Sequence, residues 1–154
     1  MGAPAGMADL VCLDTCVWIA LLTPEDTSQA AQAAAEPLLS SAGCLLVAPA
    51  WQWVEVQSVL RQKVRRGHLG DAQAAEAWDT FGAFPVHWYD GPGLRERSWS
   101  LAMELGLATA YDACLLACIE TAGDPGDVRI FLTLDQALVR ALGHPAPPYV
   151  RLVQ

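Results

Sequence analysis

Basic residues are scarce in this sequence. It contains nine lysine and arginine residues against 17 aspartate and glutamate residues, which gives a formal net charge of −8 at pH 7. Proteins that bind nucleic acid by neutralising phosphates usually present a basic surface. The composition excludes such a surface over the whole molecule, so any role with nucleic acid needs a local basic patch, a metal ion or a partner subunit.

Long apolar runs are also missing, although 53% of the residues are hydrophobic. No segment reaches the ~18 uninterrupted apolar residues of a membrane-spanning helix, and the N-terminus lacks the charged start and apolar core of a signal peptide. We therefore expect no membrane association. Residues 7–154 are expected to form a single domain, with Met7 as a candidate natural start and residues 1–6 as a tail or expression remnant.

The five cysteines include no C-x-x-C pair, and four of them lie in strongly apolar contexts. Cys114 and Cys118 share one face of a predicted helix, but two thiols without histidine partners make a poor zinc site. The cysteines are therefore predicted to be reduced and packed in the interior, as is usual in a cytoplasmic protein.

Short apolar runs alternate along the chain with longer segments of helical periodicity. Strands are predicted over residues 10–13, 44–47, 84–89, 128–132 and 149–153, and helices over residues 17–22, 26–41, 50–66, 71–81, 94–105, 110–121 and 136–142. Strands separated by helices pair in parallel through right-handed crossovers. The predicted fold class is α/β, a three-layer α/β/α sandwich with a mainly parallel sheet of four or five strands.

Four carboxylates occupy positions that such a sheet would bring together. Asp14 ends the first strand, Glu55 lies in the second turn of the helix after the second strand, Asp112 lies in the first turn of the helix before the fourth strand, and Asp135 follows the fourth strand. If the first and fourth strands are neighbours, all four acids project into one cleft at the carboxyl edge of the sheet.

Clustered carboxylates in apolar surroundings need a compensating charge, because burying an unpaired carboxylate costs several kcal/mol. No lysine or arginine adjoins Asp14, Glu55 or Asp112 in the sequence. Ligands that are all oxygen atoms favour Mg²⁺ or Mn²⁺. The alternative is structural, since single acids at strand ends and in first helical turns often act as helix caps.

The ordered set of acids resembles that of the PIN domain, the fold of the VapC toxins of bacterial and archaeal toxin–antitoxin pairs. The matching segments are residues 13–22 (LDTCVWIALL), 49–56 (PAWQWVEV), 105–113 (LGLATAYDA) and 131–135 (FLTLD). The resemblance implies a Mg²⁺- or Mn²⁺-dependent ribonuclease with Asp14, Glu55, Asp112 and Asp135 as catalytic metal ligands. It implies supporting roles for Thr15 and Thr133, whereas Cys16 stands where a small polar residue is frequent.

The same resemblance implies an RNA substrate, a cognate antitoxin protein, a homodimer and a cytoplasmic location. The one dense basic cluster lies on the helix that carries Glu55, and its members are Arg61, Lys63, Arg65 and Arg66. We regard this cluster as a candidate for contact with RNA or antitoxin. The structural alternative is a solvated helix end whose cations favour the negative end of the helix dipole.

Core packing accounts for most of the six tryptophans, and Trp18 and Trp53 are candidates for a partner surface or for stacking on a base. Two rival functions remain open. A PIN-like regulatory or binding module would have little nuclease activity, although such proteins usually lose acids of the set. A phosphoaspartyl enzyme or receiver would use Asp14, but Cys16 stands where a phosphatase needs an acid, and the single lysine, Lys63, lies in a helix.

Overall fold

A parallel β-sheet forms the centre of the structure, a computed structural model that describes residues 7–154. Its strands are β1 (Asp9–Leu13), β2 (Cys44–Pro49), β3 (His87–Tyr89), β4 (Val128–Thr133) and β5 (Val150–Leu152). The strands are arranged in the order β3-β2-β1-β4-β5, and every neighbouring pair is parallel. The predicted sheet is thus confirmed, and β1 lies at its centre.

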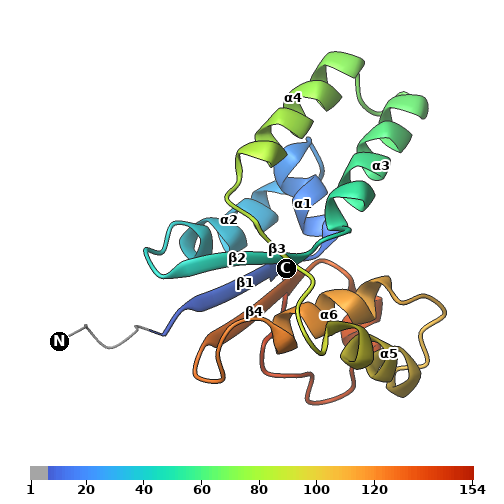
Figure 1. The fold of residues 1–154 in the computed structure, drawn as a ribbon. Coiled ribbons are helices and arrows are strands. Elements are labelled where there is room, and N and C mark those ends of the chain that lie inside the picture. Colours follow the sequence, from blue (N-terminus) through green and yellow to red (C-terminus); the bar gives the residue numbers. More distant parts are fainter. Residues whose placement is uncertain (1–6) are drawn as a thin grey trace.

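Helices cover both faces of this sheet. They are α1 (Thr15–Leu22), α2 (Ser28–Leu39), α3 (Gln52–Arg65), α4 (Asp71–Ala83), α5 (Leu94–Glu104), α6 (Tyr111–Thr121) and α7 (Gln136–Ala141). Helices α1 to α4 lie above the sheet in Figure 1, and α5 and α6 lie below it. This arrangement confirms the three-layer sandwich. No helix within residues 7–154 is long and apolar enough to cross a membrane.

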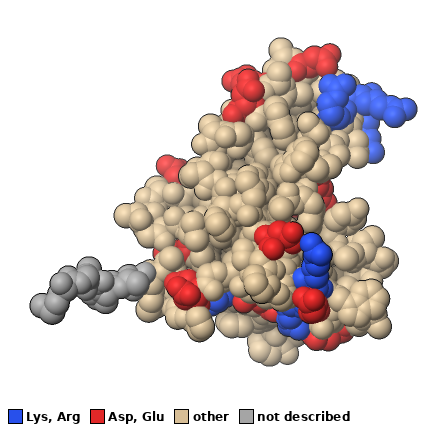
Figure 2. All heavy atoms as spheres, in the orientation of Figure 1, with Lys and Arg blue, Asp and Glu red and all other residues tan. Residues whose placement is uncertain are grey.

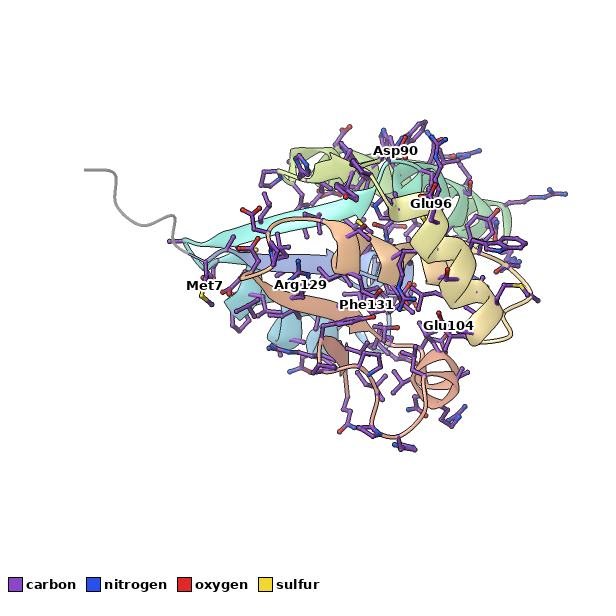
Figure 3. All side chains as sticks on the ribbon, turned by 60° about the horizontal axis from the view of Figure 1, so that its bottom comes forward. Met7, Asp90, Glu96, Glu104, Arg129 and Phe131 are labelled. Atoms are coloured by element: carbon purple, nitrogen blue, oxygen red, sulfur yellow. The ribbon has the colours of Figure 1, made fainter. Side chains whose placement is uncertain are left out.

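The packing of strand β1 on both faces explains why residues 10 to 13 are all apolar. Val11 and Leu13 pack into the layer of α1 to α4, whereas Leu10 and Cys12 pack into the layer of α5 and α6. All four side chains are completely buried. Phe131 on the neighbouring strand β4 joins the second layer (Figure 3). A strand buried on both faces needs such a continuous apolar run.

Several elements are shorter than the sequence predicted, among them α2, α3, β3 and β5. The helix expected over residues 26–41 begins only at Ser28, because the Ser28 hydroxyl accepts a hydrogen bond from the Glu25 backbone N–H and donates to the Thr23 carbonyl. The third strand covers only His87–Tyr89 of the predicted residues 84–89. Pro85 has no N–H to donate to a neighbouring strand, which explains the late start.

All five cysteines are free, as predicted, and Cys12 and Cys118 are buried. The pKa of Cys12 is raised well above its ordinary value. The hydrogen bond with Cys118 is the larger cause, and burial is the second. The Cys12 thiol therefore remains protonated, and both cysteine side chains serve as small apolar groups in the core.

Trp18 belongs to the core, so the prediction that it lies at a partner surface is wrong. It is 1% exposed and packs edge-on against Phe81 and Phe84, with ring centroids 4.9 and 5.1 Å away. These contacts join α1 to α4 and the segment after it. Trp53, by contrast, is 42% exposed, and its role in binding stays a prediction.

Replacing Trp18 by alanine should lower the free energy of unfolding by about 3–5 kcal/mol, because it opens a large cavity between α1 and α4. Urea denaturation followed by circular dichroism measures the change. Trp99→Ala is the matched control, since Trp99 is 70% exposed, and it should change stability by no more than about 0.5 kcal/mol. Equal losses in the two variants would contradict the assignment of Trp18 to the core.

Candidate metal site

Asp14 lies where the order of the sheet reverses, between β1 and β4. Its backbone N–H donates to the Leu132 carbonyl of β4 at 2.9 Å, and its own carbonyl accepts the first hydrogen bonds of α1 from Val17 and Trp18. The residue is only 7% exposed. Ligands of open α/β sheets bind at the carboxyl edge where the strand order reverses, so the fold puts Asp14 at the expected place for a functional site.

Thr133 holds the Asp14 carboxylate from the neighbouring strand. Its hydroxyl donates to Asp14 Oδ2 at 2.6 Å and accepts from the Asp135 backbone N–H at 2.9 Å. Thr133 is completely buried. One hydroxyl thus fixes the orientation of Asp14 and the start of the segment that carries Asp135.

Asp135 has a structural role of its own. It is the N-cap of α7, and its Oδ1 accepts from the backbone N–H groups of Ala137 and Leu138 at 2.8 and 2.9 Å. The structural alternative to metal binding, a helix cap, therefore applies to Asp135. Its second carboxylate oxygen makes no hydrogen bond within the described residues, so Asp135 still has one oxygen to offer a ligand.

Glu55 reaches the same edge of the sheet from α3. It lies in the first turn of that helix, not in the second as predicted, because the helix begins at Gln52. The Thr15 hydroxyl donates to Glu55 Oε2 at 2.5 Å. Since Thr15 follows Asp14 directly, this bond ties Glu55 to the end of β1.

Gln52 is a site residue that the sequence did not reveal. It is completely buried, and its amide nitrogen donates to the Leu13 carbonyl at 2.7 Å and to Thr15 Oγ1 at 3.3 Å. Its amide oxygen has no hydrogen-bond partner among the described residues. Gln52 anchors α3 to the end of β1, and the only signal in the sequence is an amide between two tryptophans.

Asp112 completes the group from the first turn of α6. Burial, together with the negative charges of Asp14, Asp135 and Glu55, raises its pKa to about 6. Burial also raises the pKa of Asp14, against the opposing hydrogen bond from Thr133. The structure therefore brings all four predicted acids within electrostatic range of one another.

None of the four carboxylates forms an ion pair within residues 7–154. The five ion pairs of this region are Arg61–Asp71, Lys63–Glu25, Arg95–Asp90, Arg97–Glu104 and Arg97–Glu120. Hard divalent ions prefer carboxylate oxygens as ligands, and these four carboxylates have no lysine or arginine paired with them in this region. The residues present thus fit Mg²⁺ or Mn²⁺ in their chemistry.

The four carboxylates are not arranged as a complete set of ligands around one ion. Among the described residues, no three histidine, cysteine, aspartate or glutamate side chains are arranged so that they could hold one ion as they stand. Mg²⁺ usually keeps several water ligands and is bound through one or two carboxylates. Binding here would require side-chain rotation, water-mediated contacts, or both.

Cys16 takes part in the hydrogen bonds around Thr133. Its sulfur accepts from the Leu134 backbone N–H at 3.5 Å and lies 4.0 Å from Thr133 Oγ1. Burial raises the pKa of Cys16 to about 12, so it stays a neutral thiol. A cysteine can therefore stand here without adding a charge to the acidic group.

The predicted basic cluster lies along the second half of α3 and extends away from the acids. Arg61 pairs with Asp71 at 3.3 Å, and Lys63 pairs with Glu25. Arg65 and Arg66 are exposed at the far end of α3, about 15 Å along the helix from Glu55 at ~1.5 Å per residue. Figure 2 shows lysine and arginine gathered at this outer end of the molecule.

Lys63 alone among them approaches the site. It lines a surface hollow together with Thr15, Cys16 and Glu25. Its ion pair with Glu25 nevertheless occupies the ammonium group in this structure. The contact of the cluster with RNA or antitoxin remains a prediction.

Comparison with known proteins identifies one family. A family model described as PIN domain matches residues 11–142 of the chain. The matched range includes all four acids and Thr133. None of the curated proteins compared with the chain matches it.

Asp112→Asn should stabilise the metal-free protein at pH 7, and the gain should shrink as the pH is lowered to 4. Folded Asp112 keeps its proton up to about pH 6, whereas the unfolded residue loses it near 3.8. Between these values the folded state binds more protons, so the stability of the wild-type protein falls as the pH rises. Urea denaturation in EDTA measures the difference. Asp79→Asn, an exposed acid on α4, is the control, and an equal gain there would contradict the account.

Thr133→Val should lower the free energy of unfolding at pH 7 by about 1–3 kcal/mol, because it leaves a buried Asp14 oxygen without its donor. Thr133→Ser keeps the hydroxyl and should recover most of the loss. Thermal and urea denaturation of both variants provide the measurement. Similar stabilities for valine and serine would show that the hydroxyl does not hold Asp14.

Proposed function

The chain belongs to the PIN domain family, whose members are generally nucleases that use divalent metal ions, and we propose that it is a Mg²⁺- or Mn²⁺-dependent ribonuclease. The proposed reaction is hydrolysis of RNA phosphodiester bonds. One observation carries the proposal: Asp14, Glu55 and Asp135 come from separate elements close enough to Asp112 to raise its pKa, and none of the four acids forms an ion pair within residues 7–154.

The acids would have different parts in holding an ion. Asp14 is the best oriented of them, because Thr133 fixes its carboxylate. Asp112 makes no hydrogen bond within residues 7–154 and is therefore free to act as a ligand. Glu55 and Asp135 each use one oxygen within the protein and have the other to offer.

A divalent ion held by these acids would lower the pKa of an attacking water and would offset negative charge on the scissile phosphate. The protein groups prepare that step. Asp112, with its pKa near 6, is mostly ionised at neutral pH, and a cation at the site would favour its carboxylate form further, since opposite charges attract. Burial of Asp14 keeps bulk water away from one side of the site.

We further propose that the protein is the toxin of a VapBC-type toxin–antitoxin pair, that it acts in the cytoplasm and that it forms a homodimer. The PIN family match and the four ordered acid motifs support this more specific assignment. RNA would be the substrate, a small cognate antitoxin would be the protein partner, and no membrane would be involved. The free thiols agree with a reducing compartment.

A PIN-like binding module with little activity is the second candidate. The observation in its favour is that no three side chains in the described part of the chain stand ready to hold one ion. The complete set of four acids favours the nuclease. The two functions differ in a direct way, because only the nuclease needs the acids for its effect on RNA.

Asp14→Asn and Asp112→Asn should each lower the rate of RNA cleavage in Mg²⁺ or Mn²⁺ by about a thousandfold or more, because each removes a charged ligand of the ion. A labelled single-stranded RNA incubated with purified protein provides the assay. Circular dichroism should show that both variants remain folded.

Asp79→Asn serves as the matched control and should cleave like the wild type, since Asp79 is exposed on α4. In cells, expression of the wild-type protein should stop growth, and expression of Asp14→Asn should not. Cleavage that survives both site substitutions would reject these acids as the catalytic group. A folded wild-type protein with no activity on RNA would favour the binding module.

A further inference from the structure

A second feature adjoins the acids, on the side that faces α5 and α6. A surface hollow of about 480 Å³ is lined by Trp51, Val54, Glu55, Ser58 and Tyr111. Glu55 belongs both to the acidic group and to this hollow, and Tyr111 directly precedes Asp112. The hollow is therefore continuous with the proposed metal site.

Two aromatic rings shape this hollow. The ring centroids of Trp51 and Tyr111 are 5.4 Å apart and the ring planes meet at 66°. Tyr111 is 57% exposed, although large aromatic side chains usually bury most of their surface. Trp51 donates its indole N–H to Cys114 Sγ at 3.1 Å, so its hydrogen-bonding group is already satisfied within the protein. What these residues offer a ligand is ring surface.

The charge of the hollow narrows the choice of ligand. Glu55 is its one charged lining residue, and no lysine or arginine lines it. A phosphate or an acidic peptide would be repelled there. A flat, uncharged ring would find apolar contact on Trp51 and on Tyr111. Base stacking on aromatic side chains has these requirements and tolerates any base.

We infer that the Trp51–Tyr111 hollow binds a nucleobase of single-stranded RNA, next to the phosphate that is cleaved at the acids. The inference rests on the proposed function and adds the substrate form, because a base inside a duplex is covered by its neighbours and cannot stack on protein rings. It adds Trp51 and Tyr111 to the predicted stacking candidates, of which Trp18 is buried and Trp53, although exposed, does not line the hollow.

The adjoining surface provides a path for the rest of the strand. Trp51 also lines a neighbouring hollow of about 480 Å³, together with Tyr89, Arg95 and Trp99. Arg95 is exposed and meets Asp90 at 3.4 Å, near the start of α5 (Figure 3). Asp90 lines this second hollow as well, so Arg95 is its one cationic lining residue and would reach a phosphate by leaving that ion pair. The strand would thus leave the acids over Trp51 towards α5.

The test uses short single-stranded RNAs that carry 2-aminopurine at one position each, since the fluorescence of this base falls when it stacks. The full-length wild-type protein is titrated in EDTA, so that binding is measured without cleavage. We expect a strong fluorescence decrease at one position of the strand. Tyr111→Ala should abolish that decrease and weaken binding about tenfold or more, whereas Tyr111→Phe should retain both.

Trp88→Ala is the matched control, because it removes a tryptophan that is 41% exposed and lines neither hollow, and it should bind like the wild type. A parallel cleavage assay in Mg²⁺ should show a higher KM for Tyr111→Ala with a smaller change in kcat. Circular dichroism of Tyr111→Ala verifies the fold.

The outcomes separate this inference from the proposed function. Equal binding and equal KM for Tyr111→Ala and the wild type, in a protein that cleaves RNA, would overturn the nucleobase site and leave the nuclease intact. A fluorescence decrease that depends on Tyr111, in a protein that cleaves no RNA, would support the nucleobase site and overturn the nuclease. Failure of the wild type to bind any of the RNAs would overturn the nucleobase site.

Discussion

Repulsion among carboxylates is the constraint on which the rest of this structure depends. Burial raises the pKa of both Asp14 and Asp112, and the charges of Asp135 and Glu55 add to the effect at Asp112. No ion pair relieves it within the described residues. A chain that only had to fold would do better with an amide at either position. The loss of stability caused by these buried carboxylates is understandable if a divalent cation neutralises their charge during function.

The fold supplies the rigidity that such a group needs. Asp14 is fixed through its backbone to β4 and through its carboxylate to Thr133, and Glu55 is fixed through Thr15. These bonds run between β1, β4 and α3, so they also join the central strand to its surroundings. Because β1 is buried on both faces, the end of this strand has little freedom to move the acid. The packing of the apolar core therefore also fixes the position of the acidic site.

The sequence was sufficient to predict the sheet, the layers and the convergence of the acids. Alternating strands and helices require parallel pairing, and acids that follow such strands meet at one edge. Other features depend on contacts between distant residues. Gln52 has no motif, and its role emerges only when its amide is seen against Leu13 and Thr15. Trp51 and Tyr111 lie far apart in the chain and meet only because α3 and α6 begin at the same edge.

One sequence prediction failed because an element distant in the sequence covers the residue. Trp18 looked available for a partner, but α4 returns over α1 and covers it with Phe81. The basic residues lie along one helix as predicted, and although Asp71 and Glu25 pair with two of them, their contact with RNA or a partner stays a prediction. Local composition does not show which element will pack against a residue.

The central claim is that these carboxylates hold a divalent ion, and crystals soaked in Mn²⁺ test it most directly by anomalous diffraction. The account predicts a strong anomalous peak within coordination distance of Asp14 and Asp112, with Glu55 and Asp135 bound directly or through water. A map that shows no peak among the four acids at saturating Mn²⁺, in crystals of the folded protein, would contradict it.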